Sequence, residues 1–280
     1  MSGVLYLCAT PIGNLEDMTF RAVRILKEAD MIAAEDTRNS LKLLKAFDID
    51  TPMTSYHHNN RYDKIEYLLK QLKEGKNIAL ISDAGMPGIS DPGEELVSAC
   101  IKEGISVSPI PGATAGLSGL VCSGMPSKEF CFEGFLPLEK KEQSRILESL
   151  KDETRTMIFY EAPHRMAKTV QAFYTSFGDR NITVCRELTK KHEEFTYTTL
   201  EMAVEFYSQN EARGEYVLII QGRDRRLLEA KEQEEFLKMP LEEHMKLYTD
   251  SGTSRKEAMK LVAKDRGLSK REIYSELLNK

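Results

Sequence analysis

Length, composition and charge narrow the class of protein before any motif is considered. A chain of 280 residues exceeds the size of a typical single domain, and 41% hydrophobic with 30% charged residues is the composition of a globular protein rather than a disordered or fibrous one. No run approaches the roughly 18 apolar residues that span a membrane, and the N-terminus lacks the basic flank of a signal peptide, so we expect a cytoplasmic protein without a membrane partner. The net charge of −5 gives no general attraction to nucleic acid.

Strand-forming and helix-forming segments alternate through the first part of the chain. Short apolar runs that end in turn residues predict buried strands, and apolar residues at helical spacing predict the helices between them. The expected strands cover residues 3–9, 31–37, 77–85 and 105–111, and the expected helices cover residues 20–29, 40–47, 61–74 and 94–104. The small-residue segment 112–124 should open a further helix. This alternation predicts an α/β lobe over residues 1–118, wound around a mostly parallel sheet.

The pattern changes near residue 130, and a second α/β lobe is expected over residues 119–224. Its expected strands cover residues 130–137, 156–163, 181–188 and 215–222, its expected helices cover residues 139–151 and 165–176, and residues 193–200 are a candidate hairpin strand. Residues 224–238 are charged with few apolar positions and predict a linker helix. The remainder contains no strand pattern. We therefore expect residues 225–280 to form a linker and a small all-α module.

Cysteines and histidines show no metal-binding pattern. The five cysteines are scattered without a CxxC spacing, which argues against a disulfide framework and against a zinc site. They are Cys8, Cys100, Cys122, Cys131 and Cys185. His57 and His58 precede Asn59 and Asn60, but adjacent side chains point apart and no carboxylate stands at ligand spacing. We therefore expect reduced, mostly buried cysteines and no metal ion.

The segment ISDAGMPGISDPG, residues 81–93, is the most informative part of the first lobe. It joins an expected buried strand to a helix through three glycines, two prolines and two aspartates. Glycine permits positive φ angles and close approach of the backbone to a ligand, while proline stiffens a loop. In open α/β sheets, ligands bind beyond the carboxyl ends of the strands, where this loop must lie. An unusually tight turn is the alternative that a single loop leaves open.

Two further loops strengthen the prediction of a binding site. Residues 10–14 (TPIGN) and 111–116 (PGATAG) follow the ends of other expected strands, so the three loops can converge on one crevice. Neither the GxGxxG pattern nor the GxxxxGK[ST] pattern is present, so a dinucleotide or a nucleoside triphosphate is not expected.

Six motifs carry a family resemblance. They are TPIGN (10–14), AAEDTR (33–38), SDAGMPGISDPG (82–93), PIPGATA (109–115), FEGFLP (132–137) and FYEAPHR (159–165). In this order and spacing they resemble the bacterial 16S rRNA cytidine 2′-O-methyltransferase I family, a branch of the tetrapyrrole-methylase-like (class III) methyltransferases. The resemblance covers residues 3–222, and no motif departs from the family pattern.

This resemblance implies a two-lobe α/β fold, usually a homodimer, that holds S-adenosylmethionine in a cleft between the lobes. The implied contacts are Asp83, Ala84, Gly85, Pro87, Gly88 and Ile89 in the longest loop, Ala113, Thr114 and Ala115 in the third loop, Pro11 and Gly13 as walls, and Phe135 and Tyr160 against the adenine. Asp83 is expected near the amino-acid or ribose end of the cofactor, and the segment at Thr114 is expected to supply backbone and hydroxyl contacts.

Methyl transfer from a sulfonium to a ribose hydroxyl sets the chemical requirement. The displacement is in line, so alignment of the acceptor oxygen, the methyl carbon and the sulfur carries much of the barrier reduction. The hydroxyl is a poor nucleophile at neutral pH, so a base, or a cation that stabilises the developing alkoxide, should also help. Two clusters can supply such groups, Glu35-Asp36-Thr37-Arg38 and Tyr160-Glu161-Ala162-Pro163-His164-Arg165.

Within these clusters both a catalytic and a structural interpretation are open. The expected catalytic residues are Glu35, Asp36, Arg38, Glu161, His164 and Arg165. The two arginines would hold RNA phosphate, and one of the four other residues would orient or deprotonate the 2′-hydroxyl. In the structural alternative, Asp36 or Thr37 caps the following helix with a salt bridge, and His164 and Arg165 cap or pair at a helix start.

The C-terminal residues are basic. Residues 254–280, which end at Lys280, carry eight Lys or Arg against four Asp or Glu, a net charge of +4, while the preceding 253 residues carry −9. Two helices are expected, with Gly267 ending one and Ser269 capping the next, and the spacing from Ala263 to Gly267 resembles a helix-turn-helix. The residues expected to contact RNA phosphates are Arg255, Lys256, Lys260, Lys264, Lys270 and Arg271. A solvated helical hairpin or a dimer contact is the alternative.

Together these features predict S-adenosylmethionine-dependent 2′-O-methylation of a cytidine ribose in 16S rRNA of the small ribosomal subunit, by a cytoplasmic homodimer. Two alternatives remain. The first is a tetrapyrrole or protein methylase of the same fold, against which the basic tail and the two charged clusters argue. The second is a non-catalytic RNA-binding assembly factor, which the intact cofactor loops disfavour.

Overall fold

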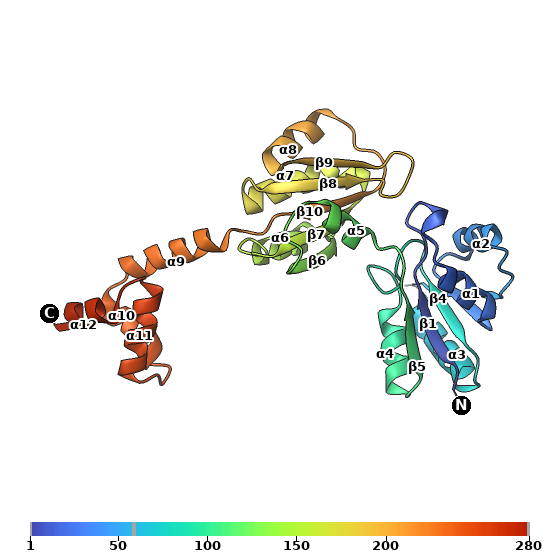
Figure 1. Cartoon of the computed structure of the whole chain (residues 1–280), viewed down its shortest axis with the longest axis horizontal. Helices are drawn as coiled ribbons and strands as arrows, with labels where there is room; N and C mark the ends of the chain where they lie inside the picture. Colours follow the sequence, from blue (N-terminus) through green and yellow to red (C-terminus); the bar gives the residue numbers. More distant parts are fainter. Residues whose placement is uncertain (1, 58–59, 279–280) are drawn as a thin grey trace. The chain divides into compact units, whose positions relative to one another are not determined.

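The computed structural model describes residues 2–57 and 60–278, so His58, Asn59 and Lys280 lie outside the described residues. The chain divides into two compact units, residues 1–148 with 155–221, and residues 149–154 with 222–280. Among the described residues, the first unit contains two five-stranded sheets and the second contains helices and no strand (Figure 1). The α/β fold with an all-α module that the sequence predicts is confirmed, while the boundaries 1–118, 119–224 and 225–280 stay a prediction.

The first sheet has the strand order β3-β2-β4-β1-β5, and every neighbouring pair is parallel. Its strands are β1 (Val4–Cys8), β2 (Met31–Ala34), β3 (Met53–Ser55), β4 (Ile78–Ile81) and β5 (Ser106–Ile110). The connections are η1 (Leu15–Asp17), α1 (Phe20–Glu28), α2 (Thr37–Ala46), α3 (Arg61–Lys73) and α4 (Glu94–Lys102). Parallel neighbours bring the carboxyl ends of these strands to one edge of the sheet, as expected from the alternation of strands and helices.

Burial on both faces explains why the central strands are almost continuously apolar. All four residues of β4 are buried. One face packs on a cluster that includes Ile25 and Leu26 of α1, and the other packs on a cluster that includes Leu68 of α3 and Leu96 of α4. Apolar side chains that leave water on both faces contribute about 25 cal/mol for each Å² that they bury. The helices therefore hold the strand ends, and the loops that follow them, in fixed positions.

The second sheet is mixed, with the order β6-β7-β10-β8-β9. Its strands are β6 (Phe130–Phe135), β7 (Thr156–Glu161), β8 (Asn181–Arg186), β9 (Glu194–Thr199) and β10 (Tyr216–Ile220). Its helices are α5 (Ala115–Cys122), α6 (Lys140–Ser149), η2 (Pro163–Arg165), α7 (Met166–Phe177) and α8 (Leu200–Gln209). Only β6 and β7 pair in parallel, and the antiparallel pair β8 and β9 confirms the expected hairpin.

Three features of the first unit differ from the sequence-based expectation. Strand β3 is three residues long at the edge of its sheet, and its mixed polarity gives no strand pattern. Helix α8 follows β9 without a loop, so its residues were included in no expected helix. Helix α2 begins at Thr37 rather than at Ser40, because the Asp36 side chain accepts a hydrogen bond from the Arg38 N–H and caps the first turn.

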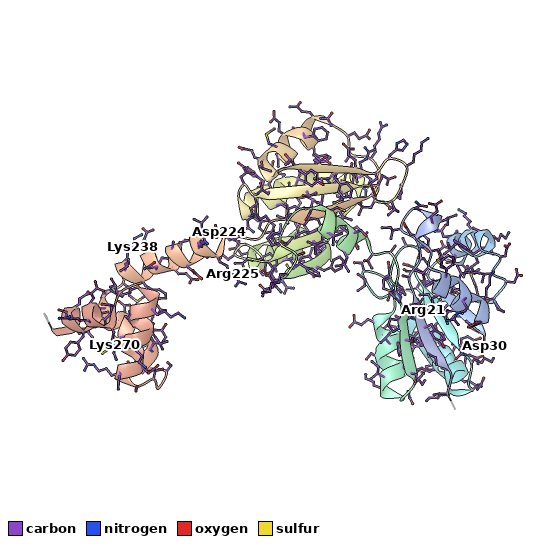
Figure 2. The ribbon with its side chains drawn as sticks, in the orientation of Figure 1. Arg21, Asp30, Asp224, Arg225, Lys238 and Lys270 are labelled. Atoms are coloured by element: carbon purple, nitrogen blue, oxygen red, sulfur yellow. The ribbon has the colours of Figure 1, made fainter. Side chains whose placement is uncertain are left out.

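The second unit consists of α9 (Arg225–Lys238), α10 (Leu241–Thr249), α11 (Arg255–Asp265) and α12 (Lys270–Leu278). Figure 2 labels Asp224 and Arg225 at the start of α9 and Lys238 at its end. The last three helices share an apolar core, whereas α9 contains no buried residue. Gly267, at φ 62°, ends α11, and Ser269 exchanges hydrogen bonds with Glu272 at the start of α12, which confirms both expected helix boundaries.

A buried polar network joins three helices of the second unit. His244 of α10 is fully buried and stacks on Phe236 of α9, with the ring centroids 4.3 Å apart. Its Nδ1 accepts a hydrogen bond from Arg266 Nε at 3.2 Å, and its Nε2 lies 3.2 Å from the Asp265 carboxylate. Tyr248 also donates to Asp265. The network therefore fixes α9 and α10 against the end of α11.

Low pH should destabilise the second unit. Burial, with the adjacent Arg266, lowers the pKa of His244 below its usual value. The unfolded chain therefore takes up the proton first, so stability is complete above the ordinary histidine pKa and falls as the pH drops below it. We expect hydrogen exchange of the α10 and α11 amides, corrected for the intrinsic rate, to quicken between pH 7 and pH 5. A His244→Gln control should lack that added dependence, and equal slopes in the two proteins would contradict the assignment.

Within residues 2–57 and 60–278 no helix has the length and apolarity needed to cross a membrane. The five cysteines form no disulfide, and Cys122 is exposed and Cys131 half-buried, so the expectation of mostly buried cysteines holds for Cys8, Cys100 and Cys185.

Candidate active site

A cavity of about 370 Å³ is lined by residues of both sheets of the first unit. Its walls come from the loops after β1, β4 and β7, from the start of α5, from the end of β6 and from the start of β10. Cavities of this size, with mostly apolar walls and a few converging polar groups, are typical small-molecule sites. The three loops that the sequence predicts to converge therefore do share one crevice.

The longest loop, residues 82–93, is held against the end of β1. Thr10 and Gly85 exchange two backbone hydrogen bonds of 2.9 and 3.0 Å, and the Thr10 hydroxyl donates to the Ser82 carbonyl at 3.2 Å. Gly85 and Gly88 have φ angles of 81° and 83°, which favour glycine. The backbone can thus turn back toward β1 and form a wall of the cavity without a side chain in the way.

The expected cofactor residues fall into two groups. Those that line the cavity are Ala84, Gly85, Ile89, Thr114, Ala115, Phe135 and Tyr160. Those that do not line it are Pro11, Gly13, Asp83, Pro87, Gly88 and Ala113. Gly13 instead packs closely on the Lys190 side chain. A Cβ at this position would come within 2.3 Å of the Lys190 Cγ. The contacts of these residues with a cofactor stay predictions.

Tyr160 of β7 links three walls of the cavity. Its hydroxyl oxygen accepts a hydrogen bond from the Gly116 N–H in α5 at 3.0 Å. The rings of Phe132 and Phe135 meet the Tyr160 ring edge-on, with centroids 5.1 and 5.5 Å away. Burial raises the pKa of Tyr160, so the hydroxyl keeps its proton. Since the oxygen already accepts a bond, the group can act as a donor toward a ligand.

The Glu35-to-Arg38 cluster forms a helix cap, which is the structural alternative that the sequence left open. The Asp36 carboxylate accepts from the Arg38 backbone N–H at 2.9 Å and pairs with the Arg38 guanidinium at 2.7 Å. These hydrogen bonds from Arg38 hold the pKa of Asp36 at about 2. A carboxylate with so low a pKa is a weak base.

Asp83 ties the long loop to the start of α2. Its two carboxylate oxygens accept from the Asp36 N–H at 3.3 Å and from the Asn39 side-chain amide at 3.0 Å. The Glu35 carboxylate in turn accepts from the Asp83 N–H at 3.5 Å. These bonds hold the long loop in position. They also give both Asp83 carboxylate oxygens a hydrogen-bond partner within the protein.

The Tyr160-to-Arg165 cluster is also built into the fold. Glu161 has a fully buried side chain that accepts from the Ala162 N–H at 2.8 Å and from the Thr169 hydroxyl at 2.5 Å. Arg165 Nε lies 3.3 Å from the same carboxylate, and its NH2 group donates to the Leu136 carbonyl. His164 is exposed. The pair Glu161 and Arg165 therefore fixes η2 against the residue that follows β6.

Asp91 is a titratable residue of the cavity wall that sequence reasoning missed. It lines the cavity two residues beyond the last loop residue expected to bind. Burial, together with the charge of Glu35, raises the pKa of Asp91 to about 6, although a hydrogen bond with Ser82 opposes this shift. A perturbed carboxyl group in a cavity is a functional-site candidate. The Asp-Pro pair of the loop, at residues 91–92, was the sequence signal that could have found it.

Further lining residues were also missed. They are Ile12, Met86, Ser90, Ala162, Pro163, Leu188, Glu215, Tyr216 and Val217. Most lie in the second lobe, in segments that the sequence marks only as apolar or as a turn.

Within the described residues, no group of three or more His, Cys, Asp or Glu side chains is arranged to hold a metal ion. His57 donates its backbone N–H to the Asn60 side chain.

Comparison with known proteins identifies the class. The family model for tetrapyrrole (corrin/porphyrin) methylases matches residues 4–203. A crystal structure of diphthine synthase matches with a TM-score of 0.60 at 11% identity, covering 79% of this chain and 90% of that one. Uroporphyrin-III C-methyltransferase from Thermus thermophilus, complexed with S-adenosyl homocysteine, matches with a TM-score of 0.55 at 20% identity, covering 78% and 97%. The fold is therefore that of a tetrapyrrole-methylase-type methyltransferase.

Sequence relatives narrow this class. Proteins named ribosomal RNA small subunit methyltransferase I are 50% identical in Halalkalibacterium halodurans, over 98% of this chain and 94% of the relative, and 47% identical in Bacillus subtilis, over 97% and 93%. The relative of that name in Synechocystis is 46% identical, over 97% of this chain and 96% of the relative. The chain belongs to the ribosomal RNA small subunit methyltransferase I family.

Proposed function

We propose that this methyltransferase transfers the methyl group of S-adenosylmethionine to the 2′-oxygen of a cytidine ribose in 16S rRNA of the small ribosomal subunit. The observation that carries the proposal is the cavity at the strand ends, in a chain whose relatives are named for methylation of small-subunit ribosomal RNA. The solved neighbour that holds S-adenosyl homocysteine supports the choice of cofactor. Bacterial ribosomes are assembled in the cytoplasm, so we expect the enzyme to act there.

The residues of the cavity fit this cofactor. Phe135 and Tyr160 offer aromatic surface for the adenine, and the glycine backbone at Gly85 leaves room for close approach. The start of α5, at Thr114 and Ala115, presents N–H groups to polar atoms of a ligand. When bound, S-adenosylmethionine supplies a sulfonium methyl group, and the chain has to align an acceptor oxygen behind it.

The expected catalytic residues receive different parts in this proposal. Asp36, Glu161 and Arg165 position the loops around the cavity through the hydrogen bonds and ion pairs described above. The Arg38 side chain is 88% exposed, so it can pair with RNA phosphate outside the cavity. His164 is also exposed, and we assign it the same role.

The test is methyl transfer to ribosomal subunits. Small subunits from cells that lack this activity are incubated with the protein and methyl-labelled S-adenosylmethionine, and the label is mapped by nuclease digestion and mass spectrometry. We expect one labelled cytidine with the methyl group on its ribose. Label on a base, or label on protein alone, would refute the proposed acceptor.

Phe135 should matter for cofactor binding. Its ring is 52% exposed and lies edge-on to Tyr160, so a bound adenine can cover it. Removing an aromatic contact of this kind costs up to about 1.5 kcal/mol, which corresponds to about a tenfold loss of affinity. We therefore expect Phe135→Ala to bind S-adenosylhomocysteine about tenfold more weakly in calorimetry. Phe130→Ala, on the same strand but outside the cavity wall, is the matched control and should bind as the wild type does.

We further propose that two copies of the chain associate through α5. Leu117 and Val121 lie one helical turn apart on this helix, and both side chains are exposed. Phe132, beside the start of α5, extends this apolar surface. Exposed apolar patches commonly mark protein interfaces. Light scattering should give twice the chain mass for the wild type, and a lower mass for Val121→Asp.

A further inference from the structure

The carboxylates that line the cavity are not equivalent. They are Asp91, Glu161 and Glu215. Glu161 is enclosed by its bonds to Ala162, Thr169 and Arg165. Glu215 has a side chain that is 77% exposed and pairs with Lys190 at 2.7 Å. Among the described residues, Asp91 thus remains as the half-buried carboxylate at the cavity wall that is not committed to an ion pair with a Lys or Arg.

Its loop holds Asp91 in place. Gly88 and Ser90 both have positive φ angles, of 83° and 65°, and Pro92 follows directly. A Cβ at Gly134 would come within 3.1 Å of Ser90 Oγ, so the loop also packs closely on β6. A carboxylate on such a loop keeps a fixed direction, which a group that acts on one acceptor atom requires.

We propose that Asp91 is the base that takes the proton of the acceptor ribose hydroxyl. This inference rests on the proposed function and assigns a residue to its chemistry. The acceptor oxygen forms a bond to the methyl carbon, the carbon–sulfur bond breaks, and its electron pair stays on sulfur, giving the neutral thioether. The hydroxyl proton moves to the Asp91 carboxylate and from there to water. The sulfonium supplies the positive charge that leaves as this proton, so the step balances.

The surroundings of Asp91 favour this role. Burial raises the pKa of Asp91 most, and the negative charges of Glu35, which follows β2, and of Asp83 raise it further, while the hydrogen bond with Ser82 lowers it. Tyr160 of β7 lines the same cavity and interacts electrostatically with Asp91. With a pKa of about 6, Asp91 is ionised at neutral pH and is a stronger base than an ordinary aspartate. The rate should therefore rise with pH through about 6 and then level off.

The experiment compares Asp91→Asn with the wild type, with small ribosomal subunits as acceptor. We expect kcat to fall about a hundredfold, as for loss of a general base. The acid limb of the pH profile should disappear. Calorimetry with S-adenosylhomocysteine should give an affinity within twofold of the wild type, and an unchanged thermal unfolding midpoint would show that the variant is folded. Full turnover in Asp91→Asn, or a loss confined to cofactor affinity, would overturn the assignment.

A second variant tests the pKa directly. Glu35→Gln removes a negative charge next to Asp91, so the acid limb should move to lower pH while Asp91 still acts as base. If Glu35→Gln abolishes the limb and Asp91→Asn keeps it, the base is Glu35 and this inference is wrong. The proposed function fails separately, if the wild-type protein transfers no methyl group to the ribosomal subunits.

Discussion

Gly85→Val should weaken S-adenosylhomocysteine binding at least a hundredfold. Gly85 lines the cavity with a φ of 81°, where a β-branched residue is strongly disfavoured. The new Cβ would also stand 3.3 Å from the side chain of Ile12, which lines the cavity, and 3.5 Å from the Ala113 carbonyl oxygen. Backbone strain costs about 1–3 kcal/mol, and the methyl groups add a steric penalty. Calorimetry with the purified variant measures the loss.

Gly104→Val is the matched control. Gly104 has a φ of 66°, in the turn between α4 and β5, and a Cβ there would meet no atom within 4 Å. Both substitutions therefore strain the backbone, but only that at Gly85 enters the cavity. We expect both variants to lose thermal stability and Gly104→Val to keep wild-type affinity. Equal affinity in the two variants would mean that the loop at Gly85 does not contact the cofactor.

Neutralising one basic face of α11 should weaken RNA binding about a hundredfold at 0.1 M salt. Lys256, Lys260 and Lys264 are exposed and four residues apart, so they lie on one face of α11. We propose that this face binds RNA phosphates. Removing one lysine–phosphate pair reduces the slope of log affinity against log salt by about 0.7–0.9. A triple Lys→Gln variant should therefore lose affinity and about two units of slope in filter-binding titrations, while its cofactor affinity stays unchanged.

The control removes the same charge elsewhere. Lys27, Lys70 and Lys102 are exposed on α1, α3 and α4, and their triple Gln variant has the same net charge as the α11 variant. If RNA binding depended only on the net charge of the protein, the two triple variants would lose the same RNA affinity. We expect the control to keep most of its affinity, because a specific contact needs the charges on one surface. Equal losses would argue for the solvated hairpin that the sequence left as an alternative.

Sequence reasoning located most elements of the fold because their signals are local. Residues 78–81 form a continuous apolar run that ends at a glycine- and proline-rich loop, and this pattern predicts a buried parallel strand without tertiary information. The edge strand at Met53–Ser55 has no such run, since an edge position buries little. Helix α8 was missed because strand-forming threonines lead directly into it.

The site was harder to derive than the fold, because its contacts join distant residues. The sequence suggests a catalytic role for Glu161. In the fold, however, its carboxylate accepts a hydrogen bond from Thr169 in the next helix, which no sequence pattern indicates. The Asp83 carboxylate accepts a hydrogen bond from the side chain of Asn39, which lies more than 40 residues earlier in the chain. The start of β10 lines the cavity through Tyr216 and Val217, which a one-dimensional pattern marks only as buried strand. Periodicity shows that a side chain is buried, and it does not show what it faces.

The most direct test of this account is a crystal structure of the protein with S-adenosylhomocysteine. We predict ligand density in the cavity, with the adenine against Phe135 and Tyr160 and polar contacts to the backbone at Gly85 and Ala115. Density at another place on the chain, with this cavity filled by side chains, would contradict it.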